Sequence, residues 1–152
     1  MKMTMLKVLT TAILISFVLC GFAAAKPEVD AQKSAEQWLS LVDAGKFSES
    51  WNTASDYFKS NAPKEQWTKS LKAVRKTLGN VIGRKLKDAR STRSLPGAPD
   101  SQYVILHFDT YFGNQRLTVE TITLSLDKDN KWRVSAYDVN WLIPREHQVL
   151  SK

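Results

Sequence analysis

Three stretches in the C-terminal half of the chain alternate between apolar and polar residues, which is the pattern of half-buried strands. They span 102–111, 116–126 and 131–139, and all three are rich in Val, Ile, Thr, Tyr and Phe. Residues typical of tight turns separate them at 113–114 and at 127–130. The pattern therefore predicts an antiparallel β-meander with one apolar face, and this face needs a cover.

The residues before the meander follow a period of 3.6 and predict three helices that supply this cover. Asp30 is a candidate N-cap for the first helix, whose apolar positions recur until Gly45 ends it. Residues 47–59 keep the same period with weaker helix formers, which favours a short helix. The third helix begins at Pro63 and ends before Gly79.

Residues 80–93 complete the predicted sheet. Charged residues occur on both sides of this stretch, as in an edge strand whose charges discourage pairing with other molecules. Two prolines in the loop 95–100 separate it from the meander. We therefore expect an α+β fold in which three N-terminal helices pack on a curved four-stranded antiparallel sheet.

Residues 1–25 have the features of a secretory signal peptide, namely lysines before an apolar core and a run of alanines at its end. An uncleaved membrane anchor is a first alternative, but the apolar core is shorter than the roughly 20 residues that a spanning helix needs. A lipoprotein signal that acylates Cys20 is the second, but Leu19 stands where a small residue is typical. We predict a periplasmic or secreted protein, cleaved after Ala25 and not transmembrane after processing.

The processed chain is predicted to form a single domain at 26–143, followed by a C-terminal tail at 144–152. The apolar residues 141–143 next to the tail either fold back to seal one end of the sheet or offer a contact to a partner. The only cysteine, Cys20, leaves with the signal peptide, which excludes disulfides and thiol chemistry from the processed domain.

The order of these elements, with several short motifs, resembles a family of secreted bacterial proteins known as domain of unknown function 4019. The motifs are Arg-Lys-Leu at 84–86, the loop 95–100, Glu-Thr at 120–121 and Lys-Trp-Arg-Val at 131–134. The resemblance implies no activity, because none is assigned to that family. The element order is also similar to the cone-shaped α+β fold of nuclear transport factor two and ketosteroid isomerase. That fold serves enzymes, ligand carriers and interaction modules, so it implies no single function.

Three residues are candidates for catalysis. His107 and Asp109 share one face of the first meander strand, where a histidine beside a carboxylate can act as an acid–base pair; the competing interpretation is a solvated polar surface. Glu120 lies among apolar residues of the middle strand and is a candidate acid or base inside the cone. The alternatives for Glu120 are an ion pair with Arg84 or Arg133, or exposure at a β-bulge.

The sequence contains no motif for a metal or a cofactor, and we predict neither. The two histidines, His107 and His147, lie far apart in the chain without a carboxylate cluster beside them. The glycines are scattered and form no phosphate-binding loop, and no serine lies in a nucleophile-elbow motif.

Charge is distributed unevenly along the chain. The whole sequence has a formal net charge of +7, and residues 59–93 hold far more basic than acidic side chains. Such asymmetry attracts anionic partners, and export argues against nucleic acid, so we predict binding to anionic lipid, to envelope polysaccharide or to a protein partner. The alternative is a solvated helix face beside a charge-protected edge strand. The candidate binding residues are Lys69, Lys72, Lys76, Lys85, Lys87 and Arg90.

Two functions remain after this reading of the sequence. The leading one is a non-enzymatic envelope protein that binds a ligand or a partner. The alternative is a small-molecule enzyme that uses a carboxylate inside the cone. A pocket above roughly 300 Å³ that contains this carboxylate would favour the enzyme, whereas a filled cone would exclude it.

Overall fold

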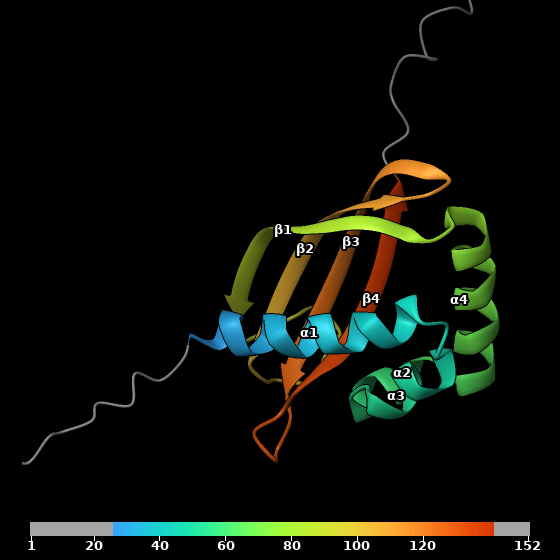
Figure 1. Cartoon of the computed structure of the whole chain (residues 1–152). Coiled ribbons are helices and arrows are strands. Elements are labelled where there is room, and N and C mark those ends of the chain that lie inside the picture. Colours follow the sequence, from blue (N-terminus) through green and yellow to red (C-terminus); the bar gives the residue numbers. More distant parts are fainter. Residues whose placement is uncertain (1–25, 142–152) are drawn as a thin grey trace, which may run out of the picture.

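The computed structural model describes residues 26–141, so the predicted signal peptide and residues 142–152 lie outside the described range. Helices come first in the chain and strands second (Figure 1). The helices are α1 (Pro27–Asp43), α2 (Phe47–Thr53), α3 (Asp56–Asn61) and α4 (Lys64–Leu78), and the strands are β1 (Val81–Thr92), β2 (Tyr103–Phe112), β3 (Gln115–Leu126) and β4 (Trp132–Trp141). The α+β class is as predicted from the sequence, with one helix more than expected.

The extra helix arises at Ser55, which divides the predicted short helix 47–59 into α2 and α3. Ala54 and Ser55 have extended backbone, and the Ser55 hydroxyl accepts a hydrogen bond from the Phe58 N–H at 3.1 Å, which is an N-cap. The Ser55 N–H in turn donates to the Val134 carbonyl of β4 at 2.9 Å. A tertiary contact with an edge strand therefore interrupts a pattern that is locally helical.

The start of α1 also differs from the expectation. Lys26 is the N-cap and Pro27 the first helical residue, so Asp30 lies in the first turn rather than at the cap. Proline suits this position because its φ is already helical, and an acid in the first turn interacts favourably with the helix dipole. Pro63 is likewise the N-cap of α4 rather than its first residue.

The sheet is an antiparallel meander in the order β1-β2-β3-β4. Glu120 of β3 pairs with Phe108 of β2 and with Val139 of β4, and the register on both sides is unbroken from Thr118 to Thr123. No bulge occurs at Glu120, so its side chain points the same way as that of Ile122, into the core. The bulge considered as an alternative is absent at Glu120, and the β3–β4 register shifts only between Thr123 and Leu124.

Helix α1 is the main cover of the sheet. It lies across the face of the strands and contacts all four, whereas α4 stands beside the sheet and packs mainly on α2 (Figure 1). Trp38 and Leu39 of α1 join Leu106 and Leu124 of the sheet in one buried cluster, to which α4 contributes Leu71. Among the described residues, no helix combines the length and the apolar composition that crossing a membrane requires.

Candidate functional site: a buried charge network beside an aromatic groove

Glu120 is fully buried, with 0% of its surface exposed, and both of its carboxylate oxygens accept two hydrogen bonds. Oε2 accepts from Arg84 Nε at 2.6 Å and from Thr110 Oγ1 at 2.5 Å. Oε1 accepts from the Tyr137 hydroxyl at 2.6 Å and from Arg75 Nη2 at 3.3 Å. A buried charge is costly unless it is paired and hydrogen-bonded, and here four donors meet that requirement.

Asp43, the last residue of α1, completes the network from the other side. Arg84 binds it through Nη1 to Oδ2 at 2.8 Å and through Nη2 to Oδ1 at 3.1 Å, and Arg75 Nη1 lies 3.1 Å from Oδ1. The Arg75 guanidinium also lies over the Phe112 ring, 4.9 Å from its centroid. Two carboxylates and two guanidinium groups thus balance in charge, and they join the ends of α1 and α4 to the sheet.

The protonation of the network follows from its geometry. Burial acts to lower the pKa of Arg84, but the hydrogen bonds to Asp43 and Glu120 outweigh it and raise this pKa. Burial raises the pKa of the Tyr137 phenol well above its ordinary value, and the negative charge of Glu120 raises it further. Both groups therefore keep their protons at neutral pH and act as donors to the carboxylates.

The ion pair between Glu120 and Arg84, one of the alternatives from the sequence, is present. Arg133, the other proposed partner, instead binds the β3–β4 turn, with Nη1 2.9 Å from Asp127 and 2.7 Å from Asp129. The carboxylate of Glu120 has no side open to a substrate, because solvent does not reach it and both oxygens are engaged.

His107 and Asp109 lie on the outer face of β2, about one-third exposed, and each faces a residue of β1. His107 Nδ1 is 3.6 Å from the Asp88 carboxylate, and Asp109 is 3.5 Å from Lys87 Nζ. No hydrogen bond joins His107 to Asp109 among the contacts of the described residues. The structure thus places the two on one face without bringing them together as an acid–base pair.

The six candidate binding residues divide into two groups. Lys87 and Arg90 are paired with acids of the sheet, since Arg90 Nε lies 2.8 Å from Asp88 and Lys87 contacts Asp109. The second set consists of four exposed lysines: Lys69, Lys72, Lys76 and Lys85. Over the described part of the chain, no carboxylate lies within 4 Å of their ammonium groups.

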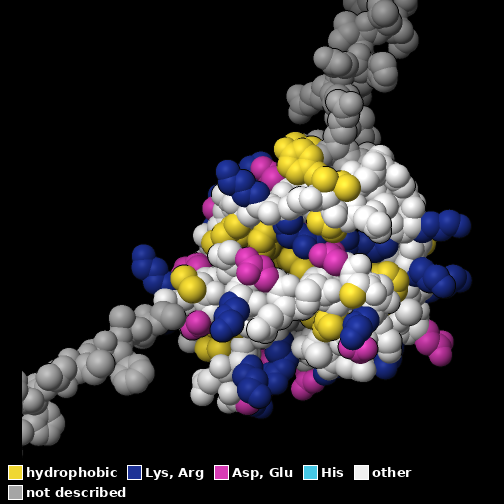
Figure 2. All heavy atoms as spheres, in the orientation of Figure 1, with side chains coloured by type: hydrophobic (Ala, Val, Ile, Leu, Met, Phe, Trp, Pro, Cys, Tyr) yellow, Lys and Arg dark blue, Asp and Glu magenta, His cyan; other side chains and the backbone are white. Residues whose placement is uncertain are grey.

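Basic and acidic side chains are mixed over much of the face that Figure 2 shows. Basic side chains project at the edge where α4 lies, in agreement with the exposure of Lys69, Lys72 and Lys76. Within 26–141, no group of three or more His, Cys, Asp or Glu side chains is arranged to hold a metal ion.

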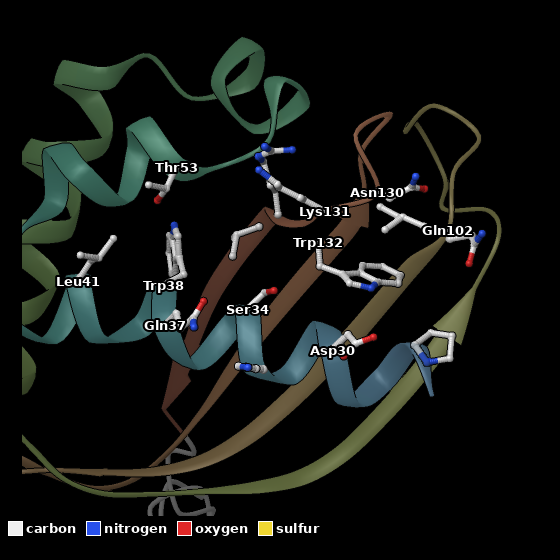
Figure 3. Close-up of a pocket in the computed structure, with 15 residues that line it drawn as sticks. Asp30, Ser34, Gln37, Trp38, Leu41, Thr53, Gln102, Asn130, Lys131 and Trp132 are labelled. Carbon is white, nitrogen blue, oxygen red and sulfur yellow. The ribbon is translucent and has the colours of Figure 1, made fainter. Parts of the chain in front are cut away.

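An open groove of about 870 Å³ runs between α1, the end of α2 and the beginning of β4 (Figure 3). Trp132 of β4 contributes partly exposed indole surface to it, and Trp38 of α1 also lines it, although only 4% of Trp38 is exposed. Polar side chains from three separate parts of the chain share the groove with these indoles. They include Asp30, Lys33, Ser34, Gln37, Gln102 and Asn130.

The groove and the charge network share a wall. Trp38 lines the groove, and its ring lies 5.3 Å from that of Tyr137, whose hydroxyl binds Glu120. Trp67 of α4 packs against both rings, at 5.9 Å from Trp38 and 6.1 Å from Tyr137. The position of this groove wall therefore depends on the same contacts that hold the buried carboxylate.

Sequence reasoning missed two charged members of the network, its two hydroxyl donors Thr110 and Tyr137, and the groove. Asp43 comes four residues after Leu39, and Arg75 comes four residues after Leu71, so each charged residue continues an apolar helix stripe. A charge on such a stripe is the signal that could have identified both. No comparable sequence pattern indicates the groove, because the two tryptophans that line it, Trp38 and Trp132, come from opposite ends of the domain.

A family model described as "Protein of unknown function (DUF4019)" matches residues 34–137. The chain belongs to this family. The matched DUF4019 region contains the whole charge network, from Asp43 to Tyr137, whereas Asp30 and Lys33 of the groove precede it. A search of curated proteins finds no match to the chain.

Replacing Glu120 with Gln should destabilise the fold by about 3–5 kcal/mol, because the change leaves two buried guanidinium groups with one carboxylate. Urea unfolding followed by circular dichroism measures this difference. Glu65→Gln is the matched control, since Glu65 is exposed on α4, and it should have a small effect. Equal effects of the two changes would contradict a structural role for the Glu120 carboxylate.

Tyr137→Phe should lower the free energy of unfolding at pH 8, and the gap to the unchanged protein should narrow above about pH 10. The folded state holds the Tyr137 proton more tightly than the unfolded chain does, because its pKa is raised. The stabilisation is therefore complete below the ordinary tyrosine pKa and is lost as pH rises through the folded-state value. Urea unfolding of both proteins between pH 8 and 11 measures the gap, and a constant gap would contradict this account.

Proposed function

We propose that this DUF4019 protein is a non-enzymatic binding module of the cell envelope, and that its ligand site is the groove between α1 and β4. The observation that carries the proposal is the groove itself. Its volume of about 870 Å³ falls within the roughly 300–1,000 Å³ typical of small-molecule sites. It also combines apolar indole surface with polar side chains, as such sites do.

The state of Glu120 supports binding rather than catalysis. The alternative enzyme needs a carboxylate that reaches a substrate inside the cone. Glu120 is buried, accepts four hydrogen bonds and does not line the groove. The curved sheet beneath α1 is consistent with the cone-shaped fold of nuclear transport factor two, which includes ligand carriers (Figure 1).

The place of action in this proposal is the periplasm or the exterior of the cell. Support comes from the sequence of residues 1–25, whose lysines, apolar core and terminal alanines are typical of a cleaved signal peptide. In this compartment the groove is exposed to components of the envelope, so we expect its ligand to be one of them.

The α4 lysines support a second part of the proposal, a reversible attachment to anionic lipid. Lys69, Lys72 and Lys76 are exposed and have no carboxylate within 4 Å in the described range, so their charge is available to a partner. Lys85 can extend this face, whereas the pairing of Lys87 and Arg90 with acids reduces their contribution. Each lysine near an anionic surface contributes roughly 1 kcal/mol, so the attachment is weak.

Hydrogen exchange tests the groove as a ligand site. An envelope extract is separated into lipid, polysaccharide, protein and low-molecular-mass fractions, and each is added to the protein. At least one fraction should slow amide exchange in α1 and in the first half of β4. The protection should disappear in a Gln37→Ala, Gln102→Ala variant and persist in Gln66→Ala, which changes an exposed glutamine of α4 away from the groove.

Unchanged exchange with every fraction would contradict the binding module. Protection that survives the double variant would place the ligand site elsewhere on the surface. Circular dichroism of each variant shows whether the fold is intact.

Sedimentation with liposomes tests the basic face of α4. The protein should associate with anionic but not with neutral liposomes at 0.1 M salt, and the association should fade at 1 M, where the Debye length falls from about 10 Å to about 3 Å. A variant in which Lys69, Lys72 and Lys76 are all replaced by Glu should not associate with anionic liposomes.

The matched control carries the same change in charge at three exposed lysines away from α4, namely Lys26, Lys46 and Lys128. It should retain most of the association, because the α4 lysines remain together on one face. Equal loss in the two variants would mean that net charge, and not this face, determines attachment.

A further inference from the structure

We propose that the groove binds a neutral saccharide chain, with one sugar ring lying on the Trp132 indole. The inference rests on the proposed function, because it names the ligand class for the same groove. Four observations support it: the shape of the surface around the groove, its uncommitted polar groups, its charge balance and the state of the β4 edge.

The groove continues into two further hollows. A hollow of about 290 Å³ shares Pro27, Gln102 and Trp132 with the groove, and another of about 560 Å³ shares Gln102, Leu126 and Asn130 with it. Gln102 thus lines all three. Adjoining hollows around one residue form an extended depression, and such a depression suits a chain of linked units better than a single compact molecule.

The polar groups of the groove suit hydroxyl groups. A sugar ring has an apolar face of C–H groups and a rim of hydroxyls, so it needs a flat apolar surface with donors and acceptors around it. Trp132 is partly exposed and supplies the surface. The side-chain amides of Gln37, Gln102 and Asn130 make no hydrogen bond to another described residue, and each amide offers both donors and an acceptor.

The charges of the groove are balanced, which favours a neutral ligand over a polyanion. Arg133 is bound by Asp127 and Asp129, and Lys131 Nζ lies 3.9 Å from Asp129. Asp30 and Lys33 are three residues apart on α1 and therefore neighbours on the helix surface. The adjoining hollows add Arg93, Lys128 and Asp100, so the whole depression, with Asp127 and Asp129, holds five basic and four acidic side chains, and an excess of one charge is small for selecting phosphate or sulfate groups.

A peptide that adds to the edge of β4 is the competing occupant, and the structure disfavours it. The Val134 carbonyl, on the part of β4 that lines the groove, already accepts a hydrogen bond from the Ser55 N–H at 2.9 Å. Strand addition relies on a free run of backbone groups along an edge. Side-chain recognition of a saccharide does not need this edge.

A broad array of neutral and anionic glycans, followed by calorimetry with the best neutral oligosaccharide at increasing chain length, tests the inference. Neutral glycans should bind, and affinity should rise with chain length beyond a single sugar. Gln102→Ala should weaken binding about threefold to tenfold, the effect of one or two hydrogen bonds, whereas Gln66→Ala should leave it unchanged. Trp132→Ala should abolish binding.

Trp132 also packs against the core, so its variant can lose binding by losing its fold. Gln102 is exposed and avoids this ambiguity. The inference would be overturned if both variants still bound neutral glycans. It would also be overturned if the array showed binding of anionic glycans alone, or of no glycan.

The failure of this inference differs from the failure of the proposed function. If no neutral glycan binds while a lipid, protein or low-molecular-mass fraction still protects α1 and β4 from exchange, the module stands and its ligand is not a saccharide. If extended peptides protect β4 instead, strand addition replaces the saccharide. If no fraction protects the groove, both proposals fail.

Discussion

The burial of the Glu120 carboxylate is the constraint on which the arrangement of the domain depends. A carboxylate without solvent costs several kcal/mol unless donors compensate it. Its four donors come from four different elements, since Arg75 lies on α4, Arg84 on β1, Thr110 on β2 and Tyr137 on β4. A shift of any of these elements removes one of the four hydrogen bonds that compensate the buried charge. Such networks add little net stability over a well-packed apolar core, so we expect the contact of Arg75 with Glu120 to act mainly by specifying where α4 lies against the sheet.

The parts of this arrangement that could be predicted from sequence are those with a local period. Alternation located the strands to within one or two residues, because consecutive strands of a meander pair with each other. Alternation also offered the inward direction of Glu120 as one of its possibilities, because one residue separates Glu120 from Ile122, and the unbroken register at Glu120 decides for it. The sequence also indicated Arg84 as one of two ion-pair partners for Glu120, because a strand next to the meander must face the same core.

The remaining parts depend on contacts between distant segments, which no local pattern specifies. Ser55 separates α2 from α3 because its N–H reaches the edge of β4, while the residues around it favour one helix. Asp43 and Arg75 meet the network because two helices end at the same place beside the sheet. The groove exists where α1 fails to cover the beginning of β4, and this depends on the crossing angle of α1 rather than on any motif.

One wall of the groove packs against the buried charge network and the other is held by ion pairs, which bears on how the groove could recognise a ligand. On one side, moving Trp38 would disturb Tyr137 and with it the hydrogen bond to Glu120. On the other side, Arg133 binds the β3–β4 turn, and its hydrogen bonds lower the pKa of Asp129 to about 2, so that carboxylate stays ionised at any physiological pH. A groove with both walls held in place needs little ordering when a ligand binds. In the binding function that we propose, selectivity comes from the fit to this preformed surface, since adapting the wall at Trp38 would break contacts that the core itself requires.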